Sequence, residues 1–364
     1  GIVSSATSLI VTGAIITNGT FTLKSDATGT ASIGNSAGTI TGNVIVERYI
    51  PAKRAWRFIG APLKNSNNNS IFYNWQNNGS AIANYGVELW APVGTSAPSS
   101  SNSGMAYYPG GTSIKAYNSA SNVWDLTTNT NTSTLFDATT NKAYCVFVTG
   151  PFTTDGSGNI NTGSSATTLS ATGTLIQGTH VKTLTPTAAN QYFLVANPYA
   201  SSVSPLSITL SSNIANNFYM WDPNCVGSYN VGQYNNYSRL GGGTYSLVGG
   251  GTVYTNSTAI QSGQAFFVQV TDNQPATITF NENNKVRPGL KNIRRIHIAS
   301  TFGSPWLYVR FVNDNGRRIL ARAFRLNTSL RTKVSTSSLY AMDTATDESR
   351  KSFLLSLEKK MGTL

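Results

Sequence analysis

Residues 56–62 read WRFIGAP, and residues 192–198 read YFLVANP. Each run of aromatic and aliphatic residues ends at a proline, which is typical of a buried strand followed by a turn. Two further pairs of similar segments follow in the same order: FYNW (72–75) with FYMW (218–221), and YCVFVT (144–149) with FFVQVT (266–271). The spacings differ only by lengths that surface loops tolerate. The sequence therefore predicts two related antiparallel β modules, at residues 51–150 and 192–281.

The segments around these modules also resemble strands. Residues 1–50 contain short alternating runs separated by Gly, Asn and Thr, so we expect a β-roll or short β-helix there. Residues 151–191 are rich in Gly, Ser and Thr and are expected to form bridging strands or a linker. Residues 282–364 are expected to be a basic β segment, a candidate start of a truncated or processed domain. The predicted fold class is all-β: a strand-repeat segment followed by tandem antiparallel β-sandwich modules.

The composition favours the same fold class. Charged residues make up only 11% of the 364 residues, and Glu, a strong helix former, occurs five times. Thr, Val, Ile and Tyr suit strands, whereas Asn, Ser and Gly suit turns. The composition therefore argues against a helical bundle and against a doubly wound α/β enzyme.

The net charge of +12 is concentrated near one end of the chain. Residues 285–333 contain twelve basic residues and one acid, a net of +11, whereas residues 65–238 contain three basic residues and five acids. A nearly uncharged surface has no field to steer nucleic acid, so no nucleic-acid partner is expected. The basic segment is either a solvated face or an interaction face for anionic polymers or a neighbour's carboxylates. Its candidate residues are Arg294, Arg295, Arg310, Arg317, Arg318, Arg322 and Arg325.

One longer stretch resembles a known family. Residues 46–62 read VERYIPAKRAWRFIGAP, preceded by NGTFTLKSDATGTASIGNSAGTITGN at 18–43. Together with NPYAS (197–201) and GQAFFV (263–268), this is similar to large β-rich surface and secreted proteins of Bacteroidota that leave the cell through the type IX secretion system. The resemblance implies an extracellular or outer-membrane-associated location and a modular β architecture. It implies no catalytic residues, because that family has none in common.

Few residues could carry catalysis or hold a metal ion. His180 and His297 are the only histidines, and neither stands in a recognisable nucleophile–base pattern. Asp155, Ser157 and Asn159 place oxygen atoms at alternate positions, as a weak calcium loop would, but a glycine-rich turn explains them better. We expect no enzymatic activity, no cofactor and no transmembrane segment. Cys145 and Cys225 allow at most one disulfide, and their spacing does not require one.

A cluster of aromatic residues leaves a choice of function open. Trp221, Tyr229, Tyr234, Tyr237 and Tyr245 lie in a Gly/Asn-rich stretch and could form a flat carbohydrate-binding surface or pair across strands within the core. The principal expectation is a non-enzymatic exported structural or adhesive protein, a fibre- or filament-forming subunit that associates with itself or with other surface proteins. The alternative is a carbohydrate-binding accessory module that uses Trp221 and the neighbouring tyrosines.

Overall fold

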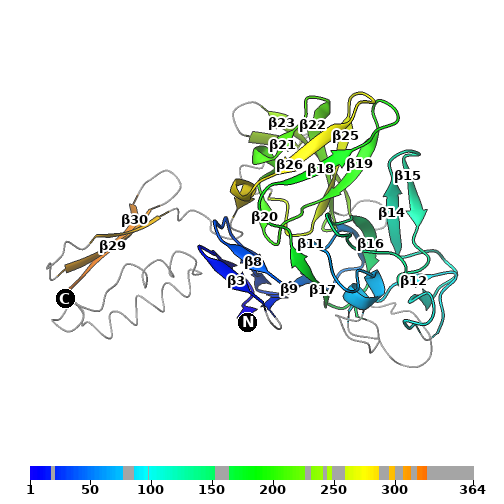
Figure 1. Ribbon diagram of the computed structural model, residues 1–364, viewed down its shortest axis with the longest axis horizontal. Helices are drawn as coiled ribbons and strands as arrows, with labels where there is room; N and C mark the ends of the chain where they lie inside the picture. The colour runs from blue at the N-terminus through cyan, green and yellow to red at the C-terminus, as the bar shows by residue number, and fades with distance from the viewer. Residues whose placement is uncertain are drawn as a thin grey trace. The chain divides into compact units, whose positions relative to one another are not determined.

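The computed structural model describes the backbone of most of the chain: residues 1–17, 21–76, 86–96, 98–151, 164–225, 231–240, 244–247, 259–286, 295–299, 306–312 and 318–325. Side chains are described up to residue 286, except at 239, 240 and 244–247. The chain divides into unit 1, Gly1–Arg287, and unit 2, Pro288–Leu364. Among the residues that the structure describes, nearly all regular structure is β (Figure 1), so the predicted fold class is confirmed.

The strands described between residues 2 and 41 form a short parallel β-helix. The first coil consists of β1 (Ile2–Val3), β2 (Ser8–Leu9) and β3 (Ala14–Ile16); the second consists of β4 (Thr22–Leu23), β7 (Ser32–Ile33) and β8 (Thr39–Thr41). Each strand of the first coil pairs in parallel with its counterpart in the second. A hairpin of β5 (Ser25–Asp26) and β6 (Gly29–Thr30) interrupts the second coil. Leu23, Ile33 and Ile40 are buried in the core between these coils and the sheets that follow.

The strand β9 (Asn43–Ile50) connects this β-helix to the rest of unit 1. It pairs in parallel with β4 on one side and antiparallel with β17 (Thr167–Leu175) on the other. β17 in turn pairs with β11 (Leu63–Lys64), which gives a five-stranded mixed sheet. The segment expected to bridge the modules therefore contributes a strand to the sheet shared with the β-helix.

Module 1, defined as residues 51–150, is built on a four-stranded antiparallel sheet. Its strands run in the order β10 (Ala55–Ile59), β16 (Tyr144–Val148), β14 (Ile114–Asn118) and β15 (Val123–Leu126). A parallel pair, β12 (Trp90–Ala91) with β13 (Ala106–Tyr107), and the short helix η1 (Phe72–Gln76) lie in the intervening segments.

Module 2, defined as residues 192–281, is a sandwich of two sheets. The larger contains β19 (Tyr192–Ala196), β25 (Ala265–Val270), β22 (Ile214–Asp222), β23 (Gln233–Leu240) and β24 (Thr244–Leu247). The smaller contains β18 (His180–Leu184), β26 (Ala276–Phe280) and β21 (Thr209–Leu210), so β18 extends the module upstream of its predicted start. The shared core includes Val195, Phe266 and Ile278. The remaining elements are η2 (Pro205–Ser207), η4 (Glu282–Asn284) and the pair of β20 (Ser202–Val203) with β27 (Lys285–Val286).

The strand pairing supports the internal repeat at the level of single residues. In module 1 Phe58 lies opposite Cys145, and in module 2 their sequence counterparts, Leu194 and Phe267, lie opposite each other. The same holds for Ile59 with Tyr144 and for Val195 with Phe266: the two central strand pairs share one register.

One of the three sequence matches does not correspond in structure. Residues 72–75 lie in the helix η1, whereas residues 218–221 lie in β22, the strand that pairs with β25. β16 of module 1 is the counterpart of β25, and the strand that pairs with it in the position of β22 is β14. The register makes Tyr117 on β14 the counterpart of Trp221 on β22. The short FY-x-W pattern therefore matched by chance.

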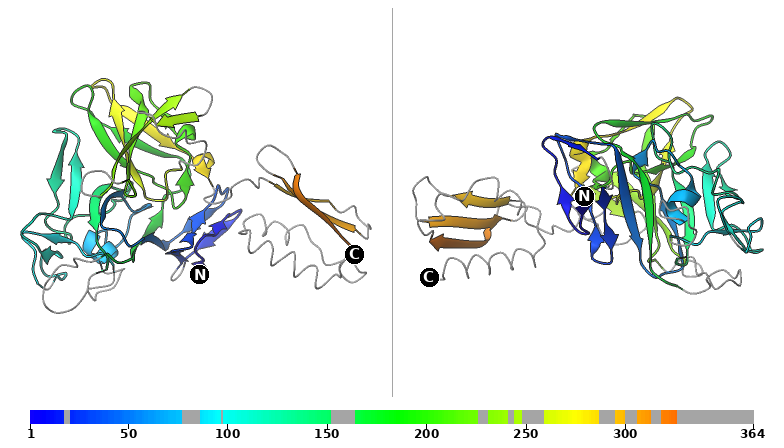
Figure 2. Two further views of the ribbon diagram at one scale, coloured as in Figure 1. Left: turned by 180° about the vertical axis from the view of Figure 1, so that it is seen from behind. Right: turned by 60° about the horizontal axis from the view of Figure 1, so that its bottom comes forward.

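Unit 2 contains a three-stranded antiparallel sheet (Figure 2), formed by β28 (Arg295–Ala299), β29 (Trp306–Val312) and β30 (Arg318–Arg325). The arginines of residues 318–326 also have helical spacing, but the strand interpretation is confirmed for Arg318–Arg325. Alternation along β29 places Leu307, Val309 and Phe311 on one face of this sheet.

Candidate functional surfaces

Two of the three arginines of the 46–62 segment, Arg57 and Arg48, hold parts of unit 1 together. The guanidinium of Arg57 is buried and donates to three backbone carbonyls, those of Ala55 at 3.0 Å, Lys53 at 3.1 Å and Pro51 at 3.4 Å. Burial, with a smaller contribution from Arg48, lowers the pKa of Arg57 to about 10, so it remains charged near neutral pH. Arg57 therefore holds the turn between β9 and β10 closed.

Arg48 connects the same segment to module 2. It donates to the carbonyl oxygen of Ser262 at 3.2 Å and to the side chain of Gln261. Burial lowers its pKa to about 10. The structure thus gives the basic residues of this segment a role in joining parts of unit 1, which sequence patterns cannot reveal because the acceptors are mainly backbone carbonyls.

The structure places the predicted aromatic residues in different environments. Tyr237 is buried and its ring stacks on Phe218 with centroids 5.0 Å apart, so it is not on the surface. Trp221 is half-buried and meets Tyr234 at 4.9 Å and Phe58 of module 1 at 5.7 Å. Tyr234 is 47% exposed. Tyr229 lies outside the described residues, and Tyr245 belongs to β24, where only the backbone is described.

Trp221 and Tyr234 contact a cluster that joins the two modules, and each module contributes equivalent positions to it. Tyr117 meets Trp124 edge to face at 5.1 Å in module 1, just as their register counterparts Trp221 and Tyr234 meet at 4.9 Å in module 2. The buried residues of the cluster are Phe58, Cys145, Ala196, Ala265 and Phe267. The contact between the modules therefore gives many of these aromatic side chains a structural role.

The register of unit 2 separates the candidate arginines between the faces of its sheet. Arg310 lies opposite His297, and Arg325 lies opposite Trp306, so these residues share a face. Arg295, two positions before His297, is on this face as well. Arg322 lies opposite Val309 and is on the other face.

The remaining candidate arginines add nothing to this assignment. Arg318 lies opposite Val312 at an irregularity in the pairing. Arg294 and Arg317 lie outside the residues whose structure is described.

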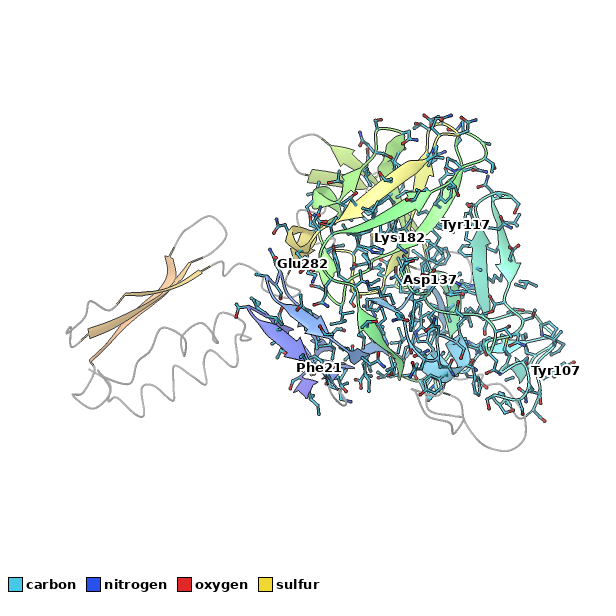
Figure 3. All side chains as sticks on the ribbon, viewed as in Figure 1. Phe21, Tyr107, Tyr117, Asp137, Lys182 and Glu282 are labelled. Carbon is cyan, nitrogen blue, oxygen red and sulfur yellow. The ribbon has the colours of Figure 1, made fainter. Side chains whose placement is uncertain are left out.

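His180 and Asp137 each lie near Lys182 in unit 1; Figure 3 labels Lys182 and Asp137. The Nε2 atom of His180 is 3.3 Å from the hydroxyl of Thr140, and the Lys182 ammonium donates to the carbonyl oxygen of Asn141 at 2.5 Å. Burial, then the charges of Lys182 and Lys64, lowers the pKa of His180 to about 4.

Asp137 does not act as a partner that would raise the basicity of this histidine. One of its oxygens accepts hydrogen bonds from the backbone of Thr139 and Thr140 at 2.8 and 2.9 Å, which closes a turn. His180 and Lys182 therefore contact the segment at residues 137–141, and the lowered pKa of His180 keeps its imidazole neutral near neutral pH.

Metal and thiol chemistry have little support in the described part of the chain. Within it, no three His, Cys, Asp or Glu side chains come together as a metal site. The calcium candidates Asp155, Ser157 and Asn159 lie outside it. Cys145 is buried and Cys225 is half-buried, and both are free thiols.

Comparisons with known proteins give no further identification. No protein-family model matches the chain, and no curated protein and no solved structure matches it significantly. Among the residues that the structure describes, no helix is long and apolar enough to cross a membrane.

Proposed function

We propose that this chain is a non-enzymatic structural or adhesive component outside the cell that associates with itself by strand addition. The observation that carries the proposal is the edge strand β15 of module 1. It ends the four-stranded sheet, and the hairpin of β14 and β15 projects from unit 1 (Figure 1). Val123 and Leu126 on β15 are 48% and 56% exposed.

An edge of this kind is suited to pairing with another strand. Natural proteins usually protect exposed edges with lysine, proline or a bulge, because unpaired backbone groups recruit further strands. β15 reads VWDL, with neither lysine nor proline, and its only charge is Asp125. A strand from another copy could continue the sheet here and bury the exposed side chains.

The oligomeric state tests the proposal. We expect the purified chain to form concentration-dependent assemblies by light scattering and ordered particles by electron microscopy. Leu126→Lys should abolish them, because it places a charge on the pairing edge. Val93→Lys is the matched control, since Val93 is 60% exposed but lies in a turn after β12. Assembly that survives Leu126→Lys, or a chain that stays monomeric throughout, contradicts the proposal.

The exported location is part of this proposal and is supported by the resemblance of the 46–62 segment to secreted β-rich proteins. Protease treatment of intact source cells would test it, because a surface protein is cleaved without lysis. Protection of the chain until the cells are lysed would contradict a surface location.

A carbohydrate-binding module remains the second candidate function. It is favoured by the exposure of Tyr234 beside Trp221, since a half-exposed aromatic pair can stack on a sugar. Loss of glycan-array binding on Tyr234→Ala, with assembly unchanged, would support this candidate over the first.

A further inference from the structure

The sheet of unit 2 has two faces of different chemical character. Its strands β28, β29 and β30 pair in a defined register, and residues directly opposite one another share a face. One face carries apolar residues on all three strands, among them Ile296, Val309 and Leu320, and at the paired positions its one charged residue is Arg322. We call the other face the Arg310 face; its basic and aromatic members are Arg295, His297, Trp306, Tyr308, Arg310 and Arg325.

The Arg310 face gathers basic residues without an acid among its strands. Arg310 lies directly opposite His297, and Arg295 is its diagonal neighbour on the same strand as His297. Like charges that are neighbours on one face of a sheet destabilise the strand pairing. None of the residues of β28, β29 and β30 is acidic, so these strands supply no carboxylate to offset the repulsion. A local arrangement that costs stability without an evident structural gain indicates a functional site.

The three arginines of this face are placed along a diagonal across the sheet. β29 is the central strand and carries Arg310. Arg295 on β28 is opposite Val312, two positions after Arg310, whereas Arg325 on β30 is opposite Trp306, four positions before it. Strands lie about 4.8 Å apart and rise about 3.4 Å per residue, so the successive Cα atoms of these arginines are about 8 Å and about 14 Å apart. The diagonal suits an extended ligand with anionic groups at intervals.

Two aromatic residues occupy the longer interval of this diagonal. Trp306 and Tyr308 precede Arg310 on the same face of β29, at every second position. Tyr308 lies opposite Ala299 on one side and Ala323 on the other, so its cross-strand neighbours are both small and no arginine is paired with it. The Arg310 face thus combines a series of cations with an aromatic residue between small neighbours.

We propose that the Arg310 face binds an acidic polysaccharide. A sheet of this kind packs through its apolar face, which leaves the charged face for a ligand. Uronate carboxylates accept charge-assisted hydrogen bonds from the planar fork of arginine, and the apolar C–H faces of sugar rings pack on aromatic side chains. An acidic peptide would make little use of Tyr308. The affinity of nucleic acid rises with the number of phosphates neutralised, and three arginines neutralise few. The inference goes beyond self-association and involves no residue of β15.

The experiment measures binding of a short oligogalacturonate to the full chain by calorimetry in about 0.15 M salt. Arg310→Gln should weaken binding about tenfold, because it removes one charge-assisted pair. Arg322→Gln is the matched control: it makes the same charge change on the opposite face of the sheet and should bind as the unmodified chain does. Tyr308→Ala should also weaken binding, whereas Tyr308→Phe, which keeps the ring, should not. Arg295→Gln repeats the test on β28 if Arg310→Gln does not fold.

Further ligands and variants separate this site from other sources of binding. A neutral cello-oligosaccharide, and an oligoglutamate and a single-stranded oligonucleotide of equal charge, should all bind much more weakly than the oligogalacturonate. Tyr234→Ala and Leu126→Lys, in unit 1, should leave oligogalacturonate binding unchanged, so failure of either function proposed above is measured separately. The proposal is overturned if the oligogalacturonate does not bind, if Arg322→Gln loses as much affinity as Arg310→Gln, or if the oligoglutamate or the oligonucleotide binds equally well.

Discussion

The rings of Phe58 and Phe267 meet edge to face, with centroids 5.4 Å apart, where module 1 packs against module 2. Both side chains are buried, at 4% exposure each. Around them lie Trp124 and Tyr117, each in ring contact with Phe267. The contact between the modules is therefore a hydrophobic core of its own.

Removal of one of these rings should destabilise unit 1 as a core substitution does. Phe267→Ala is expected to lower the free energy of unfolding by about 3–5 kcal/mol, because it removes buried surface and leaves a cavity. Phe267→Leu should cost clearly less. Denaturant titration followed by tryptophan fluorescence measures both, and equal stability of Phe267→Ala and the unmodified chain would show that the modules do not support each other.

Loss of the Arg57 side chain should open the turn between β9 and β10. Arg57→Met leaves three carbonyls without their buried donor and is expected to cost about 1–3 kcal/mol. Arg57→Lys keeps the charge but cannot reproduce the planar fork, so it should recover only part of the loss. Denaturant titration measures the cost, and complete recovery by lysine would assign the effect to charge alone.

The glycine of WRFIGAP is required by close packing. A Cβ on Gly60 would lie 2.2 Å from the carbonyl oxygen of Lys142 and 3.0 Å from the Cβ of Ala196. Gly60→Ala should therefore destabilise unit 1 by about 1–3 kcal/mol through overpacking. Gly13→Ala is the matched control, since a Cβ on Gly13 would meet no other atom within 4 Å. The two melting temperatures should differ, and identical values would contradict the close approach.

His180 should make the protein less stable in moderately acidic solution. Its pKa is about 4 in the folded chain against 6.5 for the free side chain, so the unfolded state takes up the proton first as the pH falls. Stability should therefore decline as the pH falls from 6.5 to 4, and this contribution should not change further below 4.

Calorimetric melting at a series of pH values tests this titration. His180→Gln should flatten the decline between pH 6.5 and 4. Asp26, whose pKa is lowered from 3.8 to about 2 by hydrogen bonds from Ser5 and Thr28, contributes only below that window. An unchanged slope in the glutamine variant would assign the decline to other groups.

Local sequence patterns predicted the fold class and the central strands of the modules, because apolar runs and turn residues act within a few positions. The same signals predicted a β-roll or a short β-helix at residues 1–50, and the parallel strand pairs of the structure correspond to the second. The match of residues 72–75 with 218–221 was wrong, since four residues cannot distinguish a helical turn from a strand. Which strand lies beside β16 depends on contacts distant in sequence.

The candidate surfaces were harder to predict for a physical reason. Clustering in sequence does not show which aromatic residues face another sheet, so Tyr237 and Tyr234 looked alike although one is buried and the other 47% exposed. Lys115 and Arg54 lie beside the rings of Trp56 and Phe147, and sequence spacing does not reveal either contact. The role of Arg57 depends on backbone carbonyls, which every residue carries.

The use of equivalent positions by both modules gives their contact the character of a pseudo-twofold dimer interface within one polypeptide. Covalent linkage replaces a bimolecular association by an intramolecular one with a high effective concentration, so dilution does not separate the halves. Because the two modules are fused, their contact surfaces need not be identical, as they must be in a symmetric dimer of identical chains. The pair at the centre of the contact is Phe58 with the smaller Cys145 in module 1. The equivalent pair in module 2 is Leu194 with the larger Phe267. Two identical subunits would have the same side chain at each equivalent position, whereas the two modules of a duplicated chain can have side chains of different size there.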